Sequence, residues 1–345
     1  MTAQQKRIAV VLFNLGGPDG QEAVRPFLFN LFNDKWIIAA PAPIRLLIAG
    51  LISTTRAKSA RANYAKMGGG SPIVPQTQAQ AVALERELAG RFPNAAVKVF
   101  IAMRYWKPFA EETAKAVKAW GATETILAPL YPQFSSTTTS SAIEAWAKTG
   151  APVTATLCCY PSGTKFAQAH AAAILQAWEK GGRPENPRVL FSAHGLPQQT
   201  INKGDSYQWQ VERTVEAVRP LLPAAWQHRI CYQSRVGPLK WIGPSTEEEI
   251  DQAANDKIGV IVSPIAFVSE HIETLVELDE EYGERAHARG VPYYLRAPAL
   301  GAAQGFIDAL ADLVEHAAAH PGGPRSETGS RICPGQFGLC PMKTV

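Results

Sequence analysis

Short apolar runs alternate with amphipathic segments along almost the whole chain, and this rhythm constrains the fold more than any other feature. The runs have the length and residue types of buried strands. They predict strands at residues 7–14, 97–103, 125–131, 152–158, 188–193, 229–233, 258–262 and 293–296. The segments between them predict helices at residues 77–91, 111–120, 140–148, 166–179, 207–219, 247–254, 272–288 and 302–316. Such alternation is typical of an α/β fold with parallel sheets covered by helices on both faces.

The chain is long enough for two such units. It has 345 residues, 46% of them hydrophobic, which exceeds the size at which single cores usually divide. We predict one α/β unit over residues 1–155 and a similar second unit over residues 156–300. A helix at residues 301–320 would pack back on them, and residues 321–345 would form a cysteine-bearing extension.

Charge and the amino-terminal segment exclude some classes of protein. The net charge of +4 is mild and no Lys/Arg cluster dominates, which argues against nucleic-acid binding. Residues 1–14 lead directly into a strand and lack the apolar stretch and cleavage site of a signal peptide. We therefore predict a cytoplasmic protein.

The most apolar segment, residues 27–55, has two interpretations. Lys35 and Arg45 interrupt it and Pro41 and Pro43 break it, so it lacks the ~20 apolar residues of a membrane-spanning helix. It would then form core helices around a proline turn. Alternatively it is an apolar lip that surrounds a greasy ligand, or that rests on the inner face of a membrane as a peripheral contact. The sequence leaves both interpretations open.

Imidazole and carboxylate side chains follow two of the predicted strands. His194 comes directly after one apolar run, and Glu270, His271 and Glu273 lie in the loop after another. Open α/β sheets bind ligands at the carboxyl ends of their strands. Two imidazoles and two carboxylates brought together there could handle a metal ion and protons.

The other strand-end loops contribute aromatic rings, an arginine and hydroxyls. Together these groups would line a cleft between the two units. Aromatic rings stack on a flat ligand, and arginine or hydroxyl groups bind carboxylates at its edge. The candidate lining residues are Arg104, Tyr105, Trp106, Tyr131, Phe134, Trp241 and Phe267.

Several long strings agree in order and spacing with one protein family. They are NLGGP, YAKMGGGSPI, MRYWKPF, LYPQFSSTTTSS, SAHGLP, YQSRVGPLKWIGPST and FVSEHIETLVELDEEY, and they span residues 8–315. In these strings the chain resembles the ferrochelatases, lyases that insert Fe(II) into protoporphyrin IX in the last step of haem synthesis. The resemblance implies two Rossmann-like domains with the active-site cleft between them. The alternatives are a coproporphyrin ferrochelatase and a non-catalytic carrier of a tetrapyrrole or metal.

The resemblance assigns roles to the imidazole and carboxylate groups. His194 matches the catalytic histidine, Glu273 the acidic residue that faces it across the porphyrin, and His271 the neighbour of that residue. His194 and Glu273 would bind Fe(II), and a neutral imidazole would accept pyrrole protons. Glu277 and Glu281 follow at four-residue intervals and would form a path for protons or metal; the alternative is a solvated helix face.

The resemblance also places residues around the porphyrin. Some would hold its propionates or order the lip, and one would face the ring plane. The matching positions are Leu15, Tyr64, Ser71, Arg104, Tyr105, Tyr131 and Trp241.

The five cysteines have two expected roles: one packs in the core and the other four are candidate metal ligands. Cys231 lies in a predicted strand, where it would pack as a small hydrophobe. Cys333 and Cys340 lie in a Gly/Pro-rich tail, which is typical of metal ligation. Some ferrochelatases carry a [2Fe–2S] cluster on such a tail with one internal cysteine, here Cys158 or Cys159. A third tail cysteine is missing, so the fourth ligand would be the second of that pair or a non-cysteine group; a redox-inert tail is the alternative.

Overall fold

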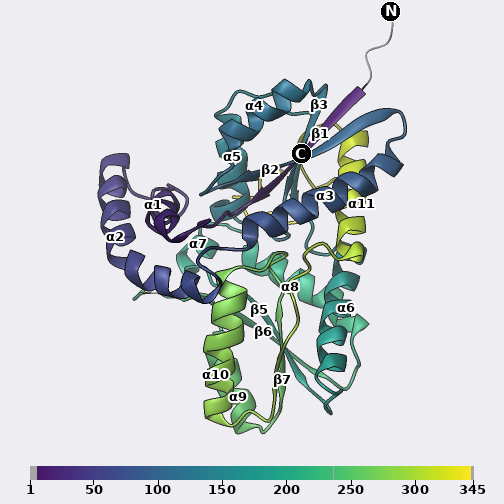
Figure 1. The fold of residues 1–345 in the computed structure, drawn as a ribbon. Coiled ribbons are helices and arrows are strands. Elements are labelled where there is room, and N and C mark those ends of the chain that lie inside the picture. Colours follow the sequence, from purple (N-terminus) through teal and green to yellow (C-terminus); the bar gives the residue numbers. More distant parts are fainter. Residues whose placement is uncertain (1–5, 236, 343–345) are drawn as a thin grey trace, which may run out of the picture.

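The computed structural model describes residues 6–235 and 237–342, and within them the chain forms two parallel sheets (Figure 1). The first sheet has the strand order β2-β1-β3-β4-β9, and the second has the order β6-β5-β7-β8. The strands are β1 (Lys6–Asn14), β2 (Ala95–Met103), β3 (Glu124–Pro129), β4 (Ala155–Cys159), β5 (Arg188–His194), β6 (Gln227–Gln233), β7 (Val260–Pro264), β8 (Tyr294–Arg296) and β9 (Gly322–Ser326). Neighbouring strands run parallel, which confirms the predicted α/β fold.

Helices cover both faces of the two sheets. They are α1 (Val24–Phe32), α2 (Ala42–Lys66), α3 (Ile73–Arg91), α4 (Ala110–Trp120), α5 (Ser141–Ala147), α6 (Thr164–Lys180), α7 (Gln198–Asn202), α8 (Tyr207–Val218), α9 (Thr246–Asn255), α10 (Tyr282–Arg289) and α11 (Gln304–Ala319). The 3-10 turns η1 (Gln21–Ala23) and η3 (Arg219–Leu221) and the π-helices η2 (Ser136–Ser140) and η4 (Glu273–Glu281) complete the described elements.

The middle strands are apolar on both faces because helices pack on both sides. Even-numbered residues of β1 from Ile8 to Leu12 pack against α3 and α11, whereas odd-numbered residues from Ala9 to Phe13 pack against α4 and α5. In β5, Phe191 packs toward α6 and α8, and Leu190 toward α9 and α10. Strands buried in this way appear in a sequence as continuous apolar runs, which is why they were recognisable.

The first sheet contains both the first and the last strand of the described residues, β1 and β9. β4 straddles the boundary predicted at residue 155, and it pairs with β3 in the first sheet. After the second sheet is complete, α11 packs on the first core and β9 pairs with β4. The predicted carboxyl-terminal extension therefore begins as a strand of the first sheet, and the chain crosses between the two sheets twice.

The apolar segment at residues 27–55 is only partly core. Phe27 and Leu28 of α1 are buried. The first half of α2 instead exposes Ile44, Leu47 and Leu51, with 52%, 76% and 66% of their surface accessible. The core-helix interpretation is therefore wrong for this half of α2, which projects beside the first sheet (Figure 1). None of the helices in the described ranges is both long and apolar enough to cross a membrane.

Candidate active site

The ends of β5, β6 and β7 bring the predicted imidazole and carboxylate groups together. His194 ends β5 and Gln233 ends β6, and the two are register partners. The N–H of Gly195 donates to the carbonyl oxygen of Gln233 at 2.8 Å. A Cβ at Gly195 would lie 2.9 Å from that oxygen, so glycine permits this close turn directly after His194. The loop after β7 then leads to η4, which begins at Glu273.

His194 and Glu273 are in direct contact. Nδ1 of His194 lies 2.8 Å from Oε2 of Glu273, and their side chains are 37% and 21% exposed. Burial lowers the pKa of His194, but the charge of Glu273 and the hydrogen bond outweigh this and raise it. Burial raises the pKa of Glu273, but the charge and hydrogen bond of His194 hold it well below its usual range. The proton of the pair therefore rests on the imidazole.

The resemblance leads us to expect that Glu273 faces His194 across the porphyrin, and in this structure the two side chains are in direct contact. A flat ring between two groups needs about 3.5 Å on each face, whereas the two atoms lie only 2.8 Å apart. The reason is the position of η4. Nε2 of Gln233 donates to the carbonyl oxygen of Glu273 at 3.0 Å, which fixes the start of this helix against the end of β6.

His271 and Glu270 lie beside the pair and differ from it. The side chain of His271 is 6% exposed, and its Nε2 lies 3.9 Å from Oε2 of Glu273. Burial holds the pKa of His271 below its ordinary value, so it is a neutral neighbour. Glu270 is bound by Arg296 at 2.8 Å and accepts a backbone N–H at 2.9 Å. Its carboxylate holds the loop in place.

Glu277 lies next to Glu273 and shares its partners. Nε2 of Gln233 donates to Oε2 of Glu277 at 3.0 Å, and the N–H of Ser234 donates to Oε1 at 2.8 Å. The hydroxyl of Tyr282 donates to Oε1 at 2.9 Å. Burial, followed by the charge of Glu273, raises the pKa of Glu277. The two neighbouring carboxylates thus have shifts in opposite directions.

Glu281 does not join this cluster. The single helix predicted at residues 272–288 is instead the π-helix η4 followed by α10. A π-helix makes i→i+5 hydrogen bonds and has a wider turn than an α-helix, so side chains four residues apart drift around its axis. Glu281 is exposed. The predicted row of three carboxylates is reduced to a pair.

The first unit contributes a buried carboxylate that the sequence analysis missed. Oδ2 of Asp34 accepts hydrogen bonds from Nη2 of Arg104 and from the hydroxyl of Tyr105, both at 2.8 Å, and from the hydroxyl of Ser141. Nε of Arg104 also donates to Ser141 at 2.6 Å. Asp34 is 4% exposed. The one available signal was a lone carboxylate inside the most apolar segment of the chain.

Three of the predicted substrate residues gather beside the start of η4. Leu15, Tyr64 and Tyr105 belong to one apolar cluster with Ile272, which precedes η4. Burial raises the pKa of Tyr64, and the charge of Glu273 adds to this shift. The strand-end loop of β1 and the end of α2 therefore adjoin the His194–Glu273 pair.

The other predicted substrate residues are more scattered. Tyr131 packs on the side of the first sheet that α4 and α5 cover. Trp241 lies against Gly195, where a Cβ would be 3.4 Å from its ring. The N–H of Ser71 donates to the carbonyl oxygen of Pro18 at 2.7 Å, which joins the turn before α3 to the loop after β1. The structure thus brings Trp241 next to His194 and gives Tyr131 a place in the core.

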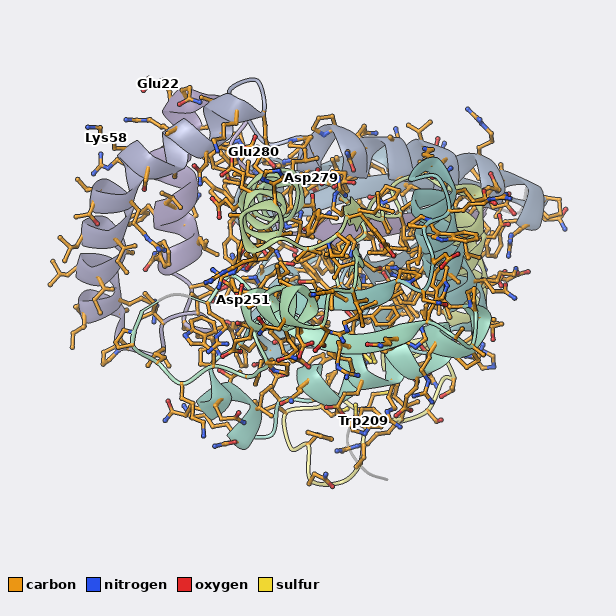
Figure 2. All side chains as sticks on the ribbon, turned by 90° about the horizontal axis from the view of Figure 1, so that it is seen from below. Glu22, Lys58, Trp209, Asp251, Asp279 and Glu280 are labelled. Carbon is orange, nitrogen blue, oxygen red and sulfur yellow. The ribbon has the colours of Figure 1, made fainter. Side chains whose placement is uncertain are left out.

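An ion pair joins α2 to η4. Nζ of Lys66, at the end of α2, binds Oε2 of Glu280, and both side chains are substantially exposed. Hydrogen bonding to Glu280 raises the pKa of Lys66. Figure 2 shows Asp279 and Glu280 on η4, with α2 to the left. This pair connects the apolar lip to the helix that carries Glu273.

The four cysteines named above occur as two pairs near the end of β4. Sγ of Cys158 lies 3.2 Å from Sγ of Cys159. A hydrogen bond from Cys340 lowers the pKa of Cys333 to about 6. The tail packs beside α8, where Trp209 lies next to it (Figure 2). Within residues 6–235 and 237–342, no group of three or more histidine, cysteine, aspartate or glutamate side chains is arranged to hold a metal ion.

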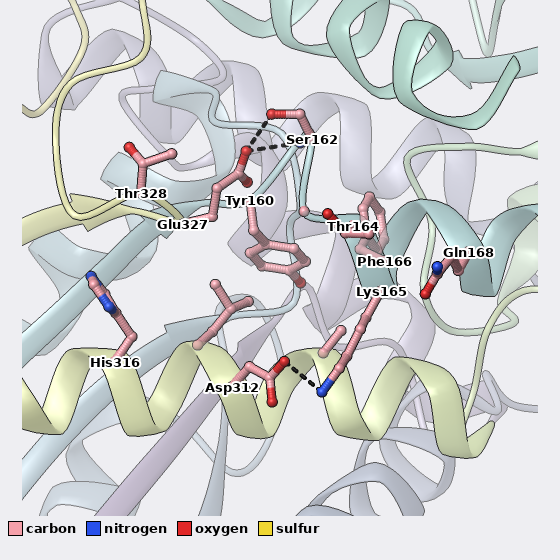
Figure 3. A pocket seen from close by; sticks show the side chains of 13 residues that line it. Tyr160, Ser162, Thr164, Lys165, Phe166, Gln168, Asp312, His316, Glu327 and Thr328 are labelled. Carbon is pink, nitrogen blue, oxygen red and sulfur yellow. Dashed lines mark hydrogen bonds and ion pairs between the residues drawn. The ribbon is translucent and has the colours of Figure 1, made fainter. Parts of the chain in front are cut away.

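A cavity of about 670 Å³ lies elsewhere, between the start of α6, α11 and the segment after β9 (Figure 3). Its charged side chains are paired with neighbours. Lys165 binds Asp312 at 2.6 Å, and Glu327 accepts the N–H of Ser162 at 3.0 Å. Burial raises the pKa of Glu327 to about 7. None of the residues predicted for the active site lines this cavity.

The fold resembles that of two solved SirB structures, one of which is described as a sirohydrochlorin chelatase. SirB from Bacillus subtilis with Fe3+ matches 91% of this chain and 96% of its own, with a TM-score of 0.52 and 12% identity. The sirohydrochlorin chelatase SirB from Bacillus subtilis subspecies spizizenii, in complex with cobalt, matches 92% and 97% with a TM-score of 0.52 and 11% identity. At such identity the likeness shows a chelatase-like fold alone.

The sequence comparisons identify the family. The ferrochelatase family profile matches residues 7–318. The ferrochelatase of Caulobacter vibrioides is 56% identical and covers 98% of both chains, and that of Phenylobacterium zucineum is 54% identical and covers 97% of both. That of Rickettsia bellii is 46% identical over 99% of this chain and 96% of its own. The chain belongs to the ferrochelatase family, enzymes of the lyase class that insert iron into a porphyrin in haem synthesis, as the resemblance implied.

Proposed function

We propose that the chain inserts Fe(II) into protoporphyrin IX and that His194 and Glu273 carry out this reaction. The observation that carries the proposal is the 2.8 Å contact between them at a partly exposed edge of the second sheet. Imidazole and carboxylate bind Fe(II) without thiolate ligands, which would hold the iron more tightly. The reaction also requires the ring to be distorted and two pyrrole protons to be removed, and binding energy can supply the distortion.

The charges of the pair define its first step. Since the proton of the pair rests on the imidazole, His194 becomes a base only after it loses this proton. Fe(II) that binds beside Glu273 repels that proton and frees the imidazole for a pyrrole N–H. His271 is neutral and buried beside Glu273, and it limits how that carboxylate moves. Glu277, whose pKa is raised, receives protons from the pair.

The porphyrin would be held from the first unit. Leu15, Tyr64 and Tyr105 provide apolar contact beside the start of η4. Arg104 uses Nε and Nη2 for Ser141 and Asp34, and its side chain is 23% exposed, so Nη1 would bind a propionate. The remaining proposed contacts are Ser71, Tyr131 and Trp241.

The test is a metalation assay with Fe(II) and either protoporphyrin IX or coproporphyrin, followed by absorbance. We expect faster insertion with protoporphyrin and its loss in His194→Ala, which removes little core packing. A coproporphyrin enzyme would show the opposite preference. A carrier would bind either porphyrin without increasing the rate of metalation. Normal turnover in His194→Ala would exclude the proposed role of this residue.

We also propose that Cys158, Cys159, Cys333 and Cys340 hold a [2Fe–2S] cluster. The support is that the four thiols are buried and lie in two pairs, and each iron of such a cluster takes two cysteine sulfurs. In the described residues they are not yet arranged as a metal site, so binding the cluster would require the two pairs to approach each other. The tail around them is fixed by Arg331, whose guanidinium donates to four backbone carbonyl oxygens. When bound, such a cluster supplies one-electron chemistry.

The cluster is tested on protein purified without added iron. We expect visible absorbance and about two irons per chain, and the loss of both in Cys340→Ser. Cys231→Ser is the matched control, since Cys231 is buried in β6 and burial raises its pKa to about 12. A colourless, iron-free wild type would refute the proposal.

We propose, finally, a peripheral membrane contact through the exposed face of α2. Ile44, Leu47 and Leu51 form an apolar surface at the end of α2 that is distant from Lys66. Such a face would lie in the interface of a bilayer and would favour a greasy porphyrin substrate.

A further inference from the structure

Ser234 has an unusual backbone for its position. Its φ is +61°, in the left-handed region that residues with a side chain other than Asn or Asp rarely adopt. The remaining non-glycine residues with positive φ in the described ranges are all exposed: Arg183, Asn186 and Lys257. Ser234 instead directly follows β6 at the candidate active site and is partly buried. Such a conformation persists where its surroundings require it.

The left-handed turn directs two donors of Ser234 toward η4. Its N–H donates to Oε1 of Glu277 at 2.8 Å, and its hydroxyl contacts Oε2 of the same carboxylate. The hydroxyl also lies 3.3 Å from Oε2 of Glu273, the atom that contacts His194. One residue thus bridges both carboxylates.

Ionised carboxylates on Glu273 and Glu277 repel each other, because like charges disfavour one another. The hydroxyl of Ser234 offsets this repulsion by contacting both of them. Gln233 and Tyr282 also donate to Glu277, whereas the hydroxyl of Ser234 contacts both carboxylates. We propose that Ser234 is a positioning residue for iron insertion: its hydroxyl and N–H hold Glu273 and Glu277 together, beside His194, as the place where Fe(II) is received. This inference rests on the proposed function.

Three substitutions at Ser234 separate the hydroxyl from the backbone. Ser234→Ala removes the hydroxyl and keeps the strained backbone. Ser234→Gly removes the hydroxyl and relieves the strain, so it remains informative if the alanine variant folds poorly. Ser234→Asn keeps a side-chain donor on a residue type that tolerates the left-handed region. Lys257→Gly is the matched control, since it relieves an exposed left-handed residue far from the site in sequence.

The experiment measures kcat and KM for Fe(II) and for porphyrin in all four variants. We expect kcat/KM for Fe(II) to fall roughly 10-fold to 100-fold in the alanine and glycine variants, with KM for porphyrin unchanged. The asparagine variant should recover part of this loss, and Lys257→Gly should match the wild type. Wild-type kcat/KM for Fe(II) in Ser234→Gly would overturn the proposal, and so would an equal rise of both KM values.

A crystal structure of Ser234→Gly tests the positioning itself, without reference to activity. We expect Glu277 to leave Glu273, or Glu273 to leave His194. An unchanged arrangement of the three side chains would overturn the proposal even if turnover had fallen. If instead the wild type inserted no iron, the proposed function would fail, and this structure would still decide whether Ser234 positions the carboxylates.

Discussion

Each of the two units contributes a carboxylate, Asp34 between α1 and α2 and Glu273 at the start of η4, and the two are used differently. Asp34 is buried and accepts hydrogen bonds from Arg104, Tyr105 and Ser141. Glu273 is 21% exposed, and its closest partner is the imidazole of His194. A guanidinium keeps its charge at any working pH, whereas an imidazole loses its proton near neutrality.

This difference separates a structural carboxylate from a chemical one. With a permanent cation and two hydroxyl donors as its partners, Asp34 ties the α1–α2 loop to Arg104 and α5. Glu273 has a partner that titrates and a second carboxylate, Glu277, in reach through Ser234. A substitution at Asp34 should therefore lower mainly stability, and a substitution at Glu273 should lower mainly turnover.

The largest expected effect is on turnover, in Glu273→Gln. Glutamine keeps the volume and a hydrogen bond to His194, but it removes the negative charge of Glu273. That charge is the one that receives Fe(II), and it also raises the pKa of the His194 imidazole. We expect kcat to fall about 10²-fold to 10⁴-fold, the range of a lost acid–base group, with an almost unchanged melting temperature. Initial-rate metalation assays measure this. The exposed Glu284→Gln is the control, and a Glu273→Gln variant with near-normal kcat would place the chemistry elsewhere.

Asp34→Asn should show the reverse pattern. The amide leaves the guanidinium of Arg104 without a counter-charge in a buried site, which costs about 2–4 kcal/mol of unfolding free energy. The folded fraction should keep most of its kcat, with a higher KM for porphyrin because Arg104 is less well held. Urea denaturation of this variant and of Asp19→Asn, which changes an exposed aspartate, measures the difference. Equal stability of the two variants would contradict a structural role.

The sequence predicted the framework better than the contacts. The apolar runs of β1 and β5 were recognisable because strands buried on both faces have no polar positions. His194 could be placed at a strand end because its run is short and Pro197 follows. Both predictions depend on local sequence, and the sheet topology then brings the strand ends to one edge.

The contacts that the sequence did not predict depend on residues far apart in the chain. Asp34 meets Arg104 and Ser141 from 70 and 107 positions away, so no local pattern announced it. The contact of Glu273 with His194 follows from the packing of η4 against Gln233 and from its π-helical turns, which spacing alone does not predict. Hydropathy also does not show whether other parts of the protein cover an apolar helix face. The sequence therefore left open whether the first half of α2 is part of the core or exposed.

The pH dependence of stability sharpens the comparison. The pKa of Glu273 lies below 4.5 and that of His194 above 6.5, their ordinary values. The pair therefore stabilises the fold fully between these two values. Its contribution is lost as the pH falls through the lowered pKa of Glu273, and as the pH rises through the raised pKa of His194. Because both groups are partly exposed, we expect less than about 1 kcal/mol.

This window is measurable as the difference in unfolding free energy between the wild type and Glu273→Gln at several pH values. The difference should be largest near pH 5 to 6 and smaller at pH 9 and pH 3. Glu284→Gln should show no such profile. A difference that grows steadily toward pH 9 would mean that the proton of the pair does not rest on His194.

The smallest expected effect on stability is in the apolar segment at residues 27–55. Asp34 in this segment is buried, whereas the first half of α2 is exposed. Leu47 is 76% exposed, so Leu47→Ser should change the unfolding free energy by less than about 0.5 kcal/mol. If this face contacts a bilayer, the same substitution should reduce co-sedimentation with anionic vesicles, because buried apolar area sets such binding. Val82→Ser is the control, since Val82 is 51% exposed on α3, outside the apolar segment. Equal co-sedimentation of both variants and the wild type would show that the apolar face of α2 does not serve as a membrane contact. The remaining explanation of this exposed apolar face would then be contact with a greasy substrate.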